Sequence, residues 1–307
     1  MSDQADGLRQ LVQARSGASA LAERPPTAPA SKAGPRARSL VLTSGKGGVG
    51  TSNLALNLAI ALGERGRRVV LVDADLGLAN IDLLCGLSPD CDLGDVLAGG
   101  RSLAEAIVEG PGSIRIIPGA HGSRTLVEAL GDAPGRLIAE FSGLEAGADF
   151  LVIDAGSGLG SSIGTLASAA DEVLVVTTPE PTSVADAHAA IHRLRRLAAP
   201  PALRAILNQV SSTDEADEVL ARLRAASRQF FGASVEGLGS VRSDPHVPLA
   251  VRSRRPFTIA YPAAAASRDV RRLARTLMER DRGSPRSRRA GFFAALAARW
   301  SPGRLPR

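Results

Sequence analysis

The chain has 307 residues, 44% of them hydrophobic, with 37 basic and 31 acidic side chains and a formal net charge of +6. This length allows one large domain or two small ones, and the composition is normal for a globular α/β protein. The lack of an apolar run of about 20 residues and of a signal peptide predicts that no segment spans a membrane. Two cysteines, Cys85 and Cys91, exclude a disulfide framework or a zinc site, and form half a metal site only if a dimer brings two chains together.

The positive charge is concentrated near the C-terminus. Residues 282–307 contain seven arginines and no acid, so the remaining residues carry 30 basic and 31 acidic side chains. The high isoelectric point therefore belongs to the tail, and the globular part lacks the charge of a direct nucleic-acid binder.

Two short segments come before the first predicted strand. Residues 1–16 have apolar side chains at helical spacing, and residues 17–37 are rich in Ala, Pro, Ser and Gly. We therefore expect a short amphipathic segment at 1–16 and a flexible linker at 17–37.

Residues 38–280 alternate between apolar runs and helical patterns. The helical stretches include 52–63, 183–198 and 213–230, and runs of Val, Ile and Leu predict strands at 39–43, 69–73, 114–117, 150–154, 173–177 and 203–207. Apolar strands that alternate with helices predict an α/β domain, with a mostly parallel sheet and helices on both faces.

The tail, residues 281–307, is basic and amphipathic. Over 288–300, one arc of about 100° of a helix gathers its large apolar side chains, Phe292, Phe293, Leu296 and Trp300. Flanking arginines suit anionic headgroups, and a helix of about 11 residues is too short to span a bilayer. We expect a surface-lying membrane helix; two alternatives are that the aromatics dock on the protein itself or that the arginines contact nucleic acid.

The most informative segment lies between the first predicted strand and the first predicted helix. Strand, glycine-rich loop and helix is the context of a phosphate-binding loop, and the pattern G-x4-G-K-[ST] fits Gly45 to Ser52 at every fixed position except Thr51, which replaces the lysine. Lys46, one of only two lysines in the chain, lies inside this loop, where a compact ammonium and a planar guanidinium are not interchangeable.

Other polar residues follow the predicted strands. Asp73 and Asp75 end the strand at 69–73, Asp154 ends that at 150–154, and Asn208 ends that at 203–207. Ligands of such sheets bind at the carboxyl ends of the strands. One carboxylate there can hold Mg²⁺, and a second can position an attacking water.

These stretches resemble the deviant-Walker P-loop ATPases of the MinD/ParA class, and most closely the FlhG (FleN, YlxH) family of flagellar-number regulators. The resemblance covers about 38–280. It rests on the loop and on four further stretches: Asp73-Ala74-Asp75-Leu76-Gly77-Leu78-Ala79-Asn80, Ile153-Asp154-Ala155-Gly156, Thr177-Thr178-Pro179-Glu180-Pro181-Thr182-Ser183, and Tyr261-Pro262 with Ser267.

The resemblance implies ATP and Mg²⁺ as ligands and an ATP-dependent homodimer. Lys46 would reach the nucleotide of the partner subunit, and Asp75 would position water. Ser52, Asp73 and Asp154 would surround the metal, and Asn208 would contact adenine. The remaining cofactor-binding positions are the loop residues Gly45, Gly47, Gly48, Val49, Gly50 and Thr51.

The N-terminus resembles the activator element of FlhG proteins. Residues 3–9 read Asp-Gln-Ala-Asp-Gly-Leu-Arg. The resemblance implies stimulation of FlhF, the signal-recognition-type flagellar GTPase, through Asp3, Gln4, Ala5 and Leu8. It also implies flagellar C-ring proteins or a flagellar transcriptional activator as partners, and a cytoplasmic protein with peripheral attachment to the inner membrane.

Thr51 departs from the family pattern. Loss of a hydrogen bond to a charged group, about 1.5–3 kcal/mol, could weaken phosphate binding roughly 10- to 100-fold. Slow ATP hydrolysis and a nucleotide-binding adaptor without hydrolysis therefore both stay open. A division-site or partition ATPase of the same class is a third interpretation, but it leaves the N-terminal element without a role. Iron–sulfur carriers of related fold are disfavoured, since they use closely paired cysteines.

Overall fold

The computed structural model describes residues 36–75, 79–120, 135–158, 160–231, 235–283 and 290–299. The N-terminal segment at 1–16 and nearly all of the linker at 17–37 lie outside the described residues, as do Trp300 and the last seven residues.

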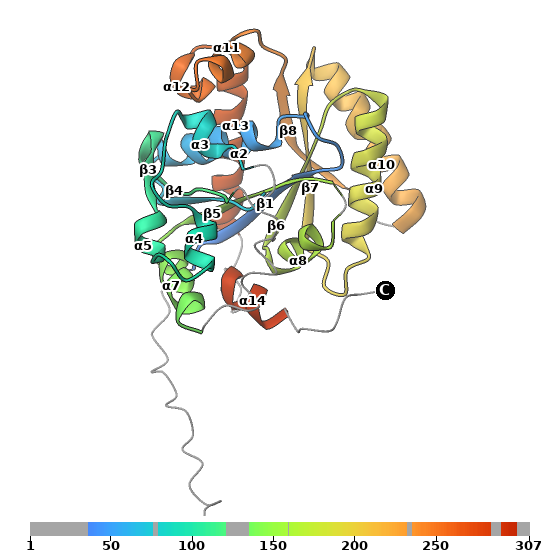
Figure 1. The fold of residues 1–307 in the computed structure, drawn as a ribbon. Coiled ribbons are helices and arrows are strands. Elements are labelled where there is room, and N and C mark those ends of the chain that lie inside the picture. The colour runs from blue at the N-terminus through green and yellow to red at the C-terminus, as the bar shows by residue number, and fades with distance from the viewer. Residues whose placement is uncertain are drawn as a thin grey trace, which may run out of the picture. The chain divides into compact units, whose positions relative to one another are not determined.

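The described part contains one eight-stranded sheet with the order β3-β4-β2-β5-β1-β6-β7-β8 (Figure 1). Neighbouring strands are parallel except β3 and β4, which pair antiparallel at one edge. The strands are β1 (Arg38–Ser44), β2 (Val69–Asp73), β3 (Val108–Gly110), β4 (Ile114–Ile117), β5 (Phe150–Ser157), β6 (Glu172–Thr177), β7 (Ala202–Val210) and β8 (Glu236–Arg242).

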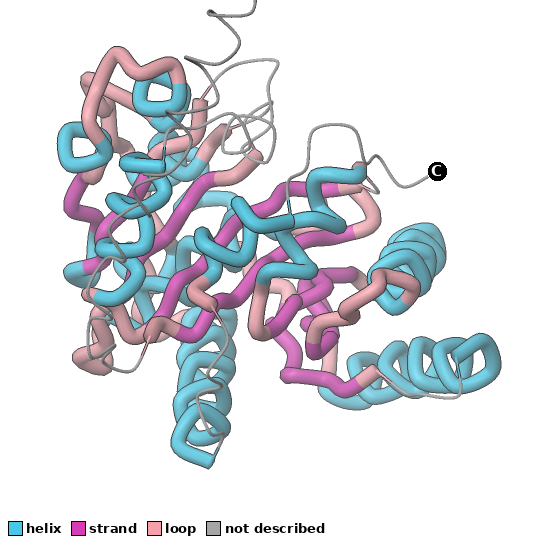
Figure 2. The backbone as a smooth tube through the Cα atoms, turned by 90° about the horizontal axis from the view of Figure 1, so that it is seen from below, coloured by secondary structure: helices cyan, strands magenta, loops and turns pink. Residues whose placement is uncertain are grey.

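Helices cover both faces of this sheet (Figure 2). One face packs against α2 (Thr51–Gly63) and α13 (Ala265–Gly283), and the other packs against α7 (Gly135–Ala146), α8 (Ser161–Ala169), α9 (Pro181–Arg195) and α10 (Thr213–Phe231). Shorter elements complete the edges: α3 (Ile81–Cys85), α4 (Leu93–Leu97), α5 (Leu103–Ala106), the 3-10 turn η1 (Pro111–Ser113), α11 (His246–Arg252) and α12 (Phe257–Ala260).

The central strands are buried on both faces, as continuous apolar sequences require. Every residue of β2 and β6 is buried, and so are six of the seven residues of β1. Strand β5 lies between β1 and β2, and its register places Asp73 directly opposite Asp154. The sheet therefore brings together two carboxylates that are 81 residues apart in the chain.

The predicted mostly parallel α/β sheet and its six strands are confirmed. Two strands were not predicted, and both are short of β-forming side chains. Strand β8 includes Gly237 and Gly239 and forms one edge of the sheet, while β3 is only Val-Glu-Gly and pairs with β4 alone. Pairing with a preformed neighbour, rather than local preference, makes both of them strands.

The C-terminal helix corrects the expected surface-lying arrangement. Helix α14 (Phe292–Arg299) packs against α7 and α8, and only 0–1% of the surface of Phe292, Phe293 and Leu296 is exposed. The described part of the apolar stripe that predicted contact with lipid thus lies in the protein's own interior, as the docking alternative has it. Burial of two Phe and one Leu side chain explains this, since each is worth about 1.5–3 kcal/mol.

No helix within the described ranges combines the length and the apolar character that crossing a bilayer requires.

Candidate nucleotide-binding site

The loop from Gly45 to Gly50 joins the central strand β1 to the N-terminus of α2. Gly48 and Gly50 have φ of 81° and 90°, in the left-handed region that only glycine adopts at low cost. Gly45 allows close packing, because a Cβ there would lie 2.1 Å from the carbonyl oxygen of Asp186 in α9. Gly50 is the N-cap of α2, and no side chain caps the helix, so its first N–H groups suit an anion.

Thr51 is buried and bonded into the loop. Its Oγ1 donates a hydrogen bond to Ser44 Oγ at 2.9 Å, and Ser44 Oγ donates to the carbonyl oxygen of Lys46, also at 2.9 Å. The side chain that replaces the lysine therefore connects the two ends of the loop and brings no charge to the phosphate position. The sequence identified the departure but not the role of Ser44.

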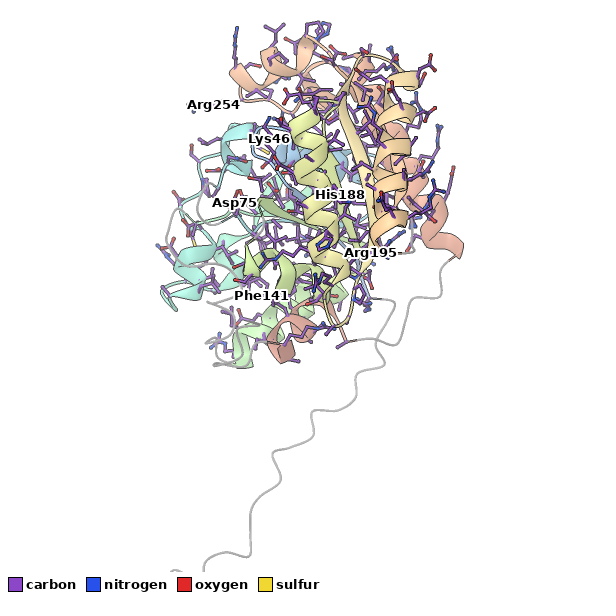
Figure 3. All side chains as sticks on the ribbon, turned by 90° about the vertical axis from the view of Figure 1, so that its right-hand side faces the viewer. Lys46, Asp75, Phe141, His188, Arg195 and Arg254 are labelled. Atoms are coloured by element: carbon purple, nitrogen blue, oxygen red, sulfur yellow. The ribbon has the colours of Figure 1, made fainter. Side chains whose placement is uncertain are left out.

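Lys46 extends from the loop toward the start of α9 (Figure 3). Its Nζ donates to Glu180 Oε2 at 2.8 Å and to Thr182 Oγ1 at 3.1 Å. The Lys46 and Glu180 side chains are 39% and 65% exposed, and such pairs contribute only about 0–1 kcal/mol. The ammonium can therefore exchange these partners for a phosphate at little cost.

Asp154 and Ser52 form the part of the site best suited to a cation. Asp154 is fully buried and accepts hydrogen bonds from Ser52 and from the N–H of Gly156, and its Oδ2 has no hydrogen-bond partner among the described residues. Burial raises the pKa of Asp154 to about 6, although the Ser52 hydrogen bond opposes the shift. A buried carboxylate oxygen without a donor, beside a hydroxyl, fits a hard cation such as Mg²⁺.

Asp73 accepts backbone hydrogen bonds that the sequence did not predict. Its carboxylate accepts the N–H groups of Asp75, Asn80 and Ile81 at 3.0–3.2 Å, which fixes the turn that carries Asp75. Burial, followed by the charge of Asp154, raises its pKa to about 8. A bound cation would favour the ionised forms of both carboxylates.

Asp75 reaches the same region from the end of β2. A Cβ on Gly156 would lie 2.2 Å from its Oδ2, so the carboxylate packs directly on the turn after Asp154. Among the residues that the structure describes, no three His, Cys, Asp or Glu side chains gather as a metal site. Ser52 and Asp154 are the side chains whose described contacts fit a cation, and the predicted roles of Asp73 at the metal and of Asp75 with water stay predictions.

Asn208 braces the loop. Its Nδ2 donates to the carbonyl oxygen of Val49 at 2.7 Å, and a Cβ on Gly50 would lie 2.6 Å from the same nitrogen. The predicted contact of Asn208 with adenine remains a prediction. Strands β1, β2, β5, β6 and β7 thus all deliver residues to one edge of the sheet, the arrangement of a nucleotide site.

A model of the CobQ/CobB/MinD/ParA nucleotide binding domain matches residues 40–257. The chain belongs to this family. It is 39% identical over 228 residues to antiactivator FleN of Pseudomonas aeruginosa, a match that covers 74% of this chain and 81% of FleN. It is 30% identical over 242 residues to the flagellum site-determining protein YlxH of Helicobacter pylori, covering 78% of this chain and 82% of YlxH.

Among solved structures, the septum site-determining protein MinD of Pyrococcus horikoshii OT3, in complex with Mg-ADP, has a TM-score of 0.64 and 27% identity. The match covers 80% of this chain and 97% of that protein. These similarities confirm the P-loop ATPase fold of the MinD/ParA class and the resemblance to its FlhG (FleN, YlxH) branch.

Sequence reasoning missed the two partners of Lys46 in this MinD/ParA-family chain. Glu180 and Thr182 belong to a stretch that carried the family resemblance, but no pattern assigned them a role. Residues 46 and 180 are far apart in the sequence, and they meet because β6, which precedes Glu180, lies next to β1, which precedes Lys46.

Proposed function

We propose that the protein is an ATP-switched dimeric regulator of flagellar number and placement. The observation that carries the proposal is the loop itself: a signature lysine, held by an exposed ion pair with Glu180 and a hydrogen bond to Thr182, beside Ser52 and the buried Asp154. The flagellar assignment is supported by the similarity to FleN and YlxH. MinD in its Mg-ADP complex supports Mg·nucleotide as the ligand.

The mechanism follows from the parts of the site. The N–H groups at the start of α2 would bind phosphate oxygens, Ser52 and Asp154 would hold Mg²⁺, and Asp75 would orient water. Lys46 leaves Glu180 and reaches the nucleotide of a second subunit, which ties dimerisation to ATP. Bound Mg²⁺ would supply neutralisation of phosphate charge.

The first prediction tests the switch. Lys46→Ala should abolish ATP-dependent dimerisation, because the contact between subunits loses a full charge. Light scattering of the full chain with and without Mg·ATP measures this. Arg101→Ala is the matched control, since Arg101 is also an exposed cation in an ion pair, with Glu105 of α5, and lies outside the loop. An unchanged monomer–dimer ratio in the wild-type protein on addition of ATP would refute the switch.

A second candidate function is a nucleotide-binding adaptor that does not hydrolyse ATP. Thr51 favours it, because its hydroxyl is already bonded to Ser44 and carries no charge for the outer phosphates. ATP turnover of the wild-type protein, measured together with dimerisation, separates the adaptor from a slow ATPase.

The N-terminal segment adds stimulation of FlhF to the proposal. Gln4 is the proposed active side chain, because an amide can orient an attacking water. A peptide of residues 1–16 should raise the GTP turnover of FlhF, and the same peptide with Gln4→Ala should not. Equal stimulation by both peptides would exclude the role of Gln4.

The membrane is the remaining proposed partner. Phe292, Phe293 and Leu296 are buried in the described state, so lipid contact requires helix α14 to leave α7 and α8. We propose that it does so in the ATP-bound dimer. FlhF and membrane binding would then make the nucleotide state a positional signal for the flagellum.

A further inference from the structure

Helix α14 is held by a carboxylate from another part of the fold. Glu145, near the end of α7, has a side chain that is only 2% exposed. Its Oε1 accepts the N–H of Phe292 at 2.9 Å, and its Oε2 lies 3.4 Å from the N–H of Phe293. N–H groups of the first helical turn have no acceptor within their own helix, so the Glu145 carboxylate supplies one. Its negative charge also lies at the positive end of the helix dipole.

The residues around this contact allow the backbone before α14 to lie close to the Glu145 carboxylate. A Cβ on Gly291 would lie 2.7 Å and 3.0 Å from the two carboxylate oxygens of Glu145. On the apolar side, the rings of Phe293 and Phe141 are 4.5 Å apart, and Figure 3 shows Phe141 beside α14. Glu145 thus caps the helix at the point where its aromatic stripe enters the core.

The same carboxylate faces a cation from the other end of the chain. Arg36 Nη1 lies 3.8 Å from Glu145 Oε1, too far for a hydrogen bond, while Nη2 of the same guanidinium pairs with Asp171. Both Nη1 and Nε of Arg36 are buried without a hydrogen-bond partner among the described residues. Arg36 is also the first described residue, and it lies near the end of the expected linker at 17–37.

In each of the two states, either Arg36 or Glu145 lacks hydrogen-bond partners. With α14 docked, Glu145 is satisfied by two N–H groups, and two donors of Arg36 are not. With α14 undocked, Glu145 would be a buried carboxylate without those donors, and Arg36 Nη1 would be the nearby donor able to replace them. A shift of less than 1 Å would bring the pair from 3.8 Å to the hydrogen-bond range.

We propose that Glu145 is a shared anchor: in the docked state it caps α14 and forms only a long ion pair with Arg36, and in the undocked state it accepts a hydrogen bond from Arg36. Release of the C-terminal helix would then change how Arg36, the first described residue, is held. The exchange itself needs neither nucleotide nor lipid. It therefore goes beyond the proposed function.

Amide hydrogen exchange of the full-length protein tests the anchor. Glu145→Gln keeps the shape but weakens the cap, and the amides of 292–296 should exchange about 10-fold faster. Arg36→Gln removes the competitor, so the same amides should exchange about threefold slower or more. Amides of β1 and β5 monitor the fold, and Arg136→Gln on α7 is the matched control, because Arg136 pairs with Glu140 on the surface.

The double variant makes the test specific. If Arg36 acts through Glu145, then Arg36→Gln should change nothing further in a Glu145→Gln background. Faster exchange of α14 in Arg36→Gln would show that Arg36 supports docking, and would overturn the proposal. So would an equal effect of Arg36→Gln with and without the Glu145 carboxylate. Because no nucleotide, membrane or GTPase is present, either failure leaves the proposed function standing.

Discussion

At the scale of single residues, the site differs from the usual phosphate loop at one position. Thr51 carries no charge, but it is not idle, since it ties Ser44 to the loop through a 2.9 Å hydrogen bond. The sequence showed which residue was exceptional and could not show this contact, because the partner is defined by the fold of the loop. The same holds for Lys46, whose partners lie more than 130 residues away.

Thr51→Lys separates the two interpretations of nucleotide use. An added ammonium should raise ATP affinity by about 10- to 100-fold, the range of a charged hydrogen bond. If Thr51 limits hydrolysis, turnover should rise as well; if the protein is a binding switch, turnover should stay low and the dimer should persist. Calorimetric affinity and phosphate release measure the two quantities. Thr51→Val is the control for losing the hydroxyl, and no rise in either quantity for Thr51→Lys would mean that another side chain already fills the lysine's role.

The buried carboxylates predict a pH dependence. The pKa of Asp73 is raised to about 8 and that of Asp154 to about 6 by burial, so the folded protein holds protons that the unfolded chain releases near pH 4. Stability without Mg²⁺ should therefore fall as pH rises from about 4 to 8. Asp154→Asn removes one charge and the repulsion on Asp73, and should raise stability at pH 8 by about 1–3 kcal/mol.

Thermal unfolding in a chelator between pH 5 and 8 measures this effect. Asp149→Asn is the control of opposite sign, because the hydrogen bond and charge of Arg68 lower the pKa of Asp149. Removing that carboxylate should not stabilise the protein at pH 8. A lower unfolding temperature for Asp154→Asn than for the wild-type protein at pH 8 would contradict the assignment of uncompensated buried charge.

At the scale of elements, the six predicted strands and the helices expected at 52–63, 183–198 and 213–230 follow from the sequence, because continuous apolar runs and helical periods match their burial. Strand β8 does not, since its glycines remove the alternation and only its pairing with β7 defines it. Helix α14 was located correctly, but in the described state its apolar side chains pack on α7 and α8 instead of lying exposed on the surface. An apolar stripe says that a helix needs a partner surface, and it cannot distinguish lipid from α7 and α8.

The elements of the site were predictable for a related reason. Asp73, Asp154 and Asn208 each follow an apolar strand, and parallel strands end at one edge. The sequence could not show how the hydrogen bonding of the two carboxylates differs. Asp73 accepts hydrogen bonds from three backbone N–H groups, whereas one oxygen of Asp154 has no donor among the described residues. That difference depends on the α3 turn, which folds back onto Asp73.

At the scale of the whole molecule, membrane attachment should depend on both docking and dimerisation. Undocking exposes two Phe and one Leu side chain per chain, and an ATP dimer offers two such helices, so its avidity should exceed that of the monomer about 100-fold or more. Sedimentation with vesicles containing anionic lipid should show ATP-dependent binding, lost on deletion of 288–307. Glu145→Gln, which weakens docking but leaves the lipid-binding face intact, should raise binding without ATP. If that variant binds vesicles no better than the wild-type protein, or if the deleted protein still binds on addition of ATP, then α14 is a structural helix and the membrane is reached by another surface.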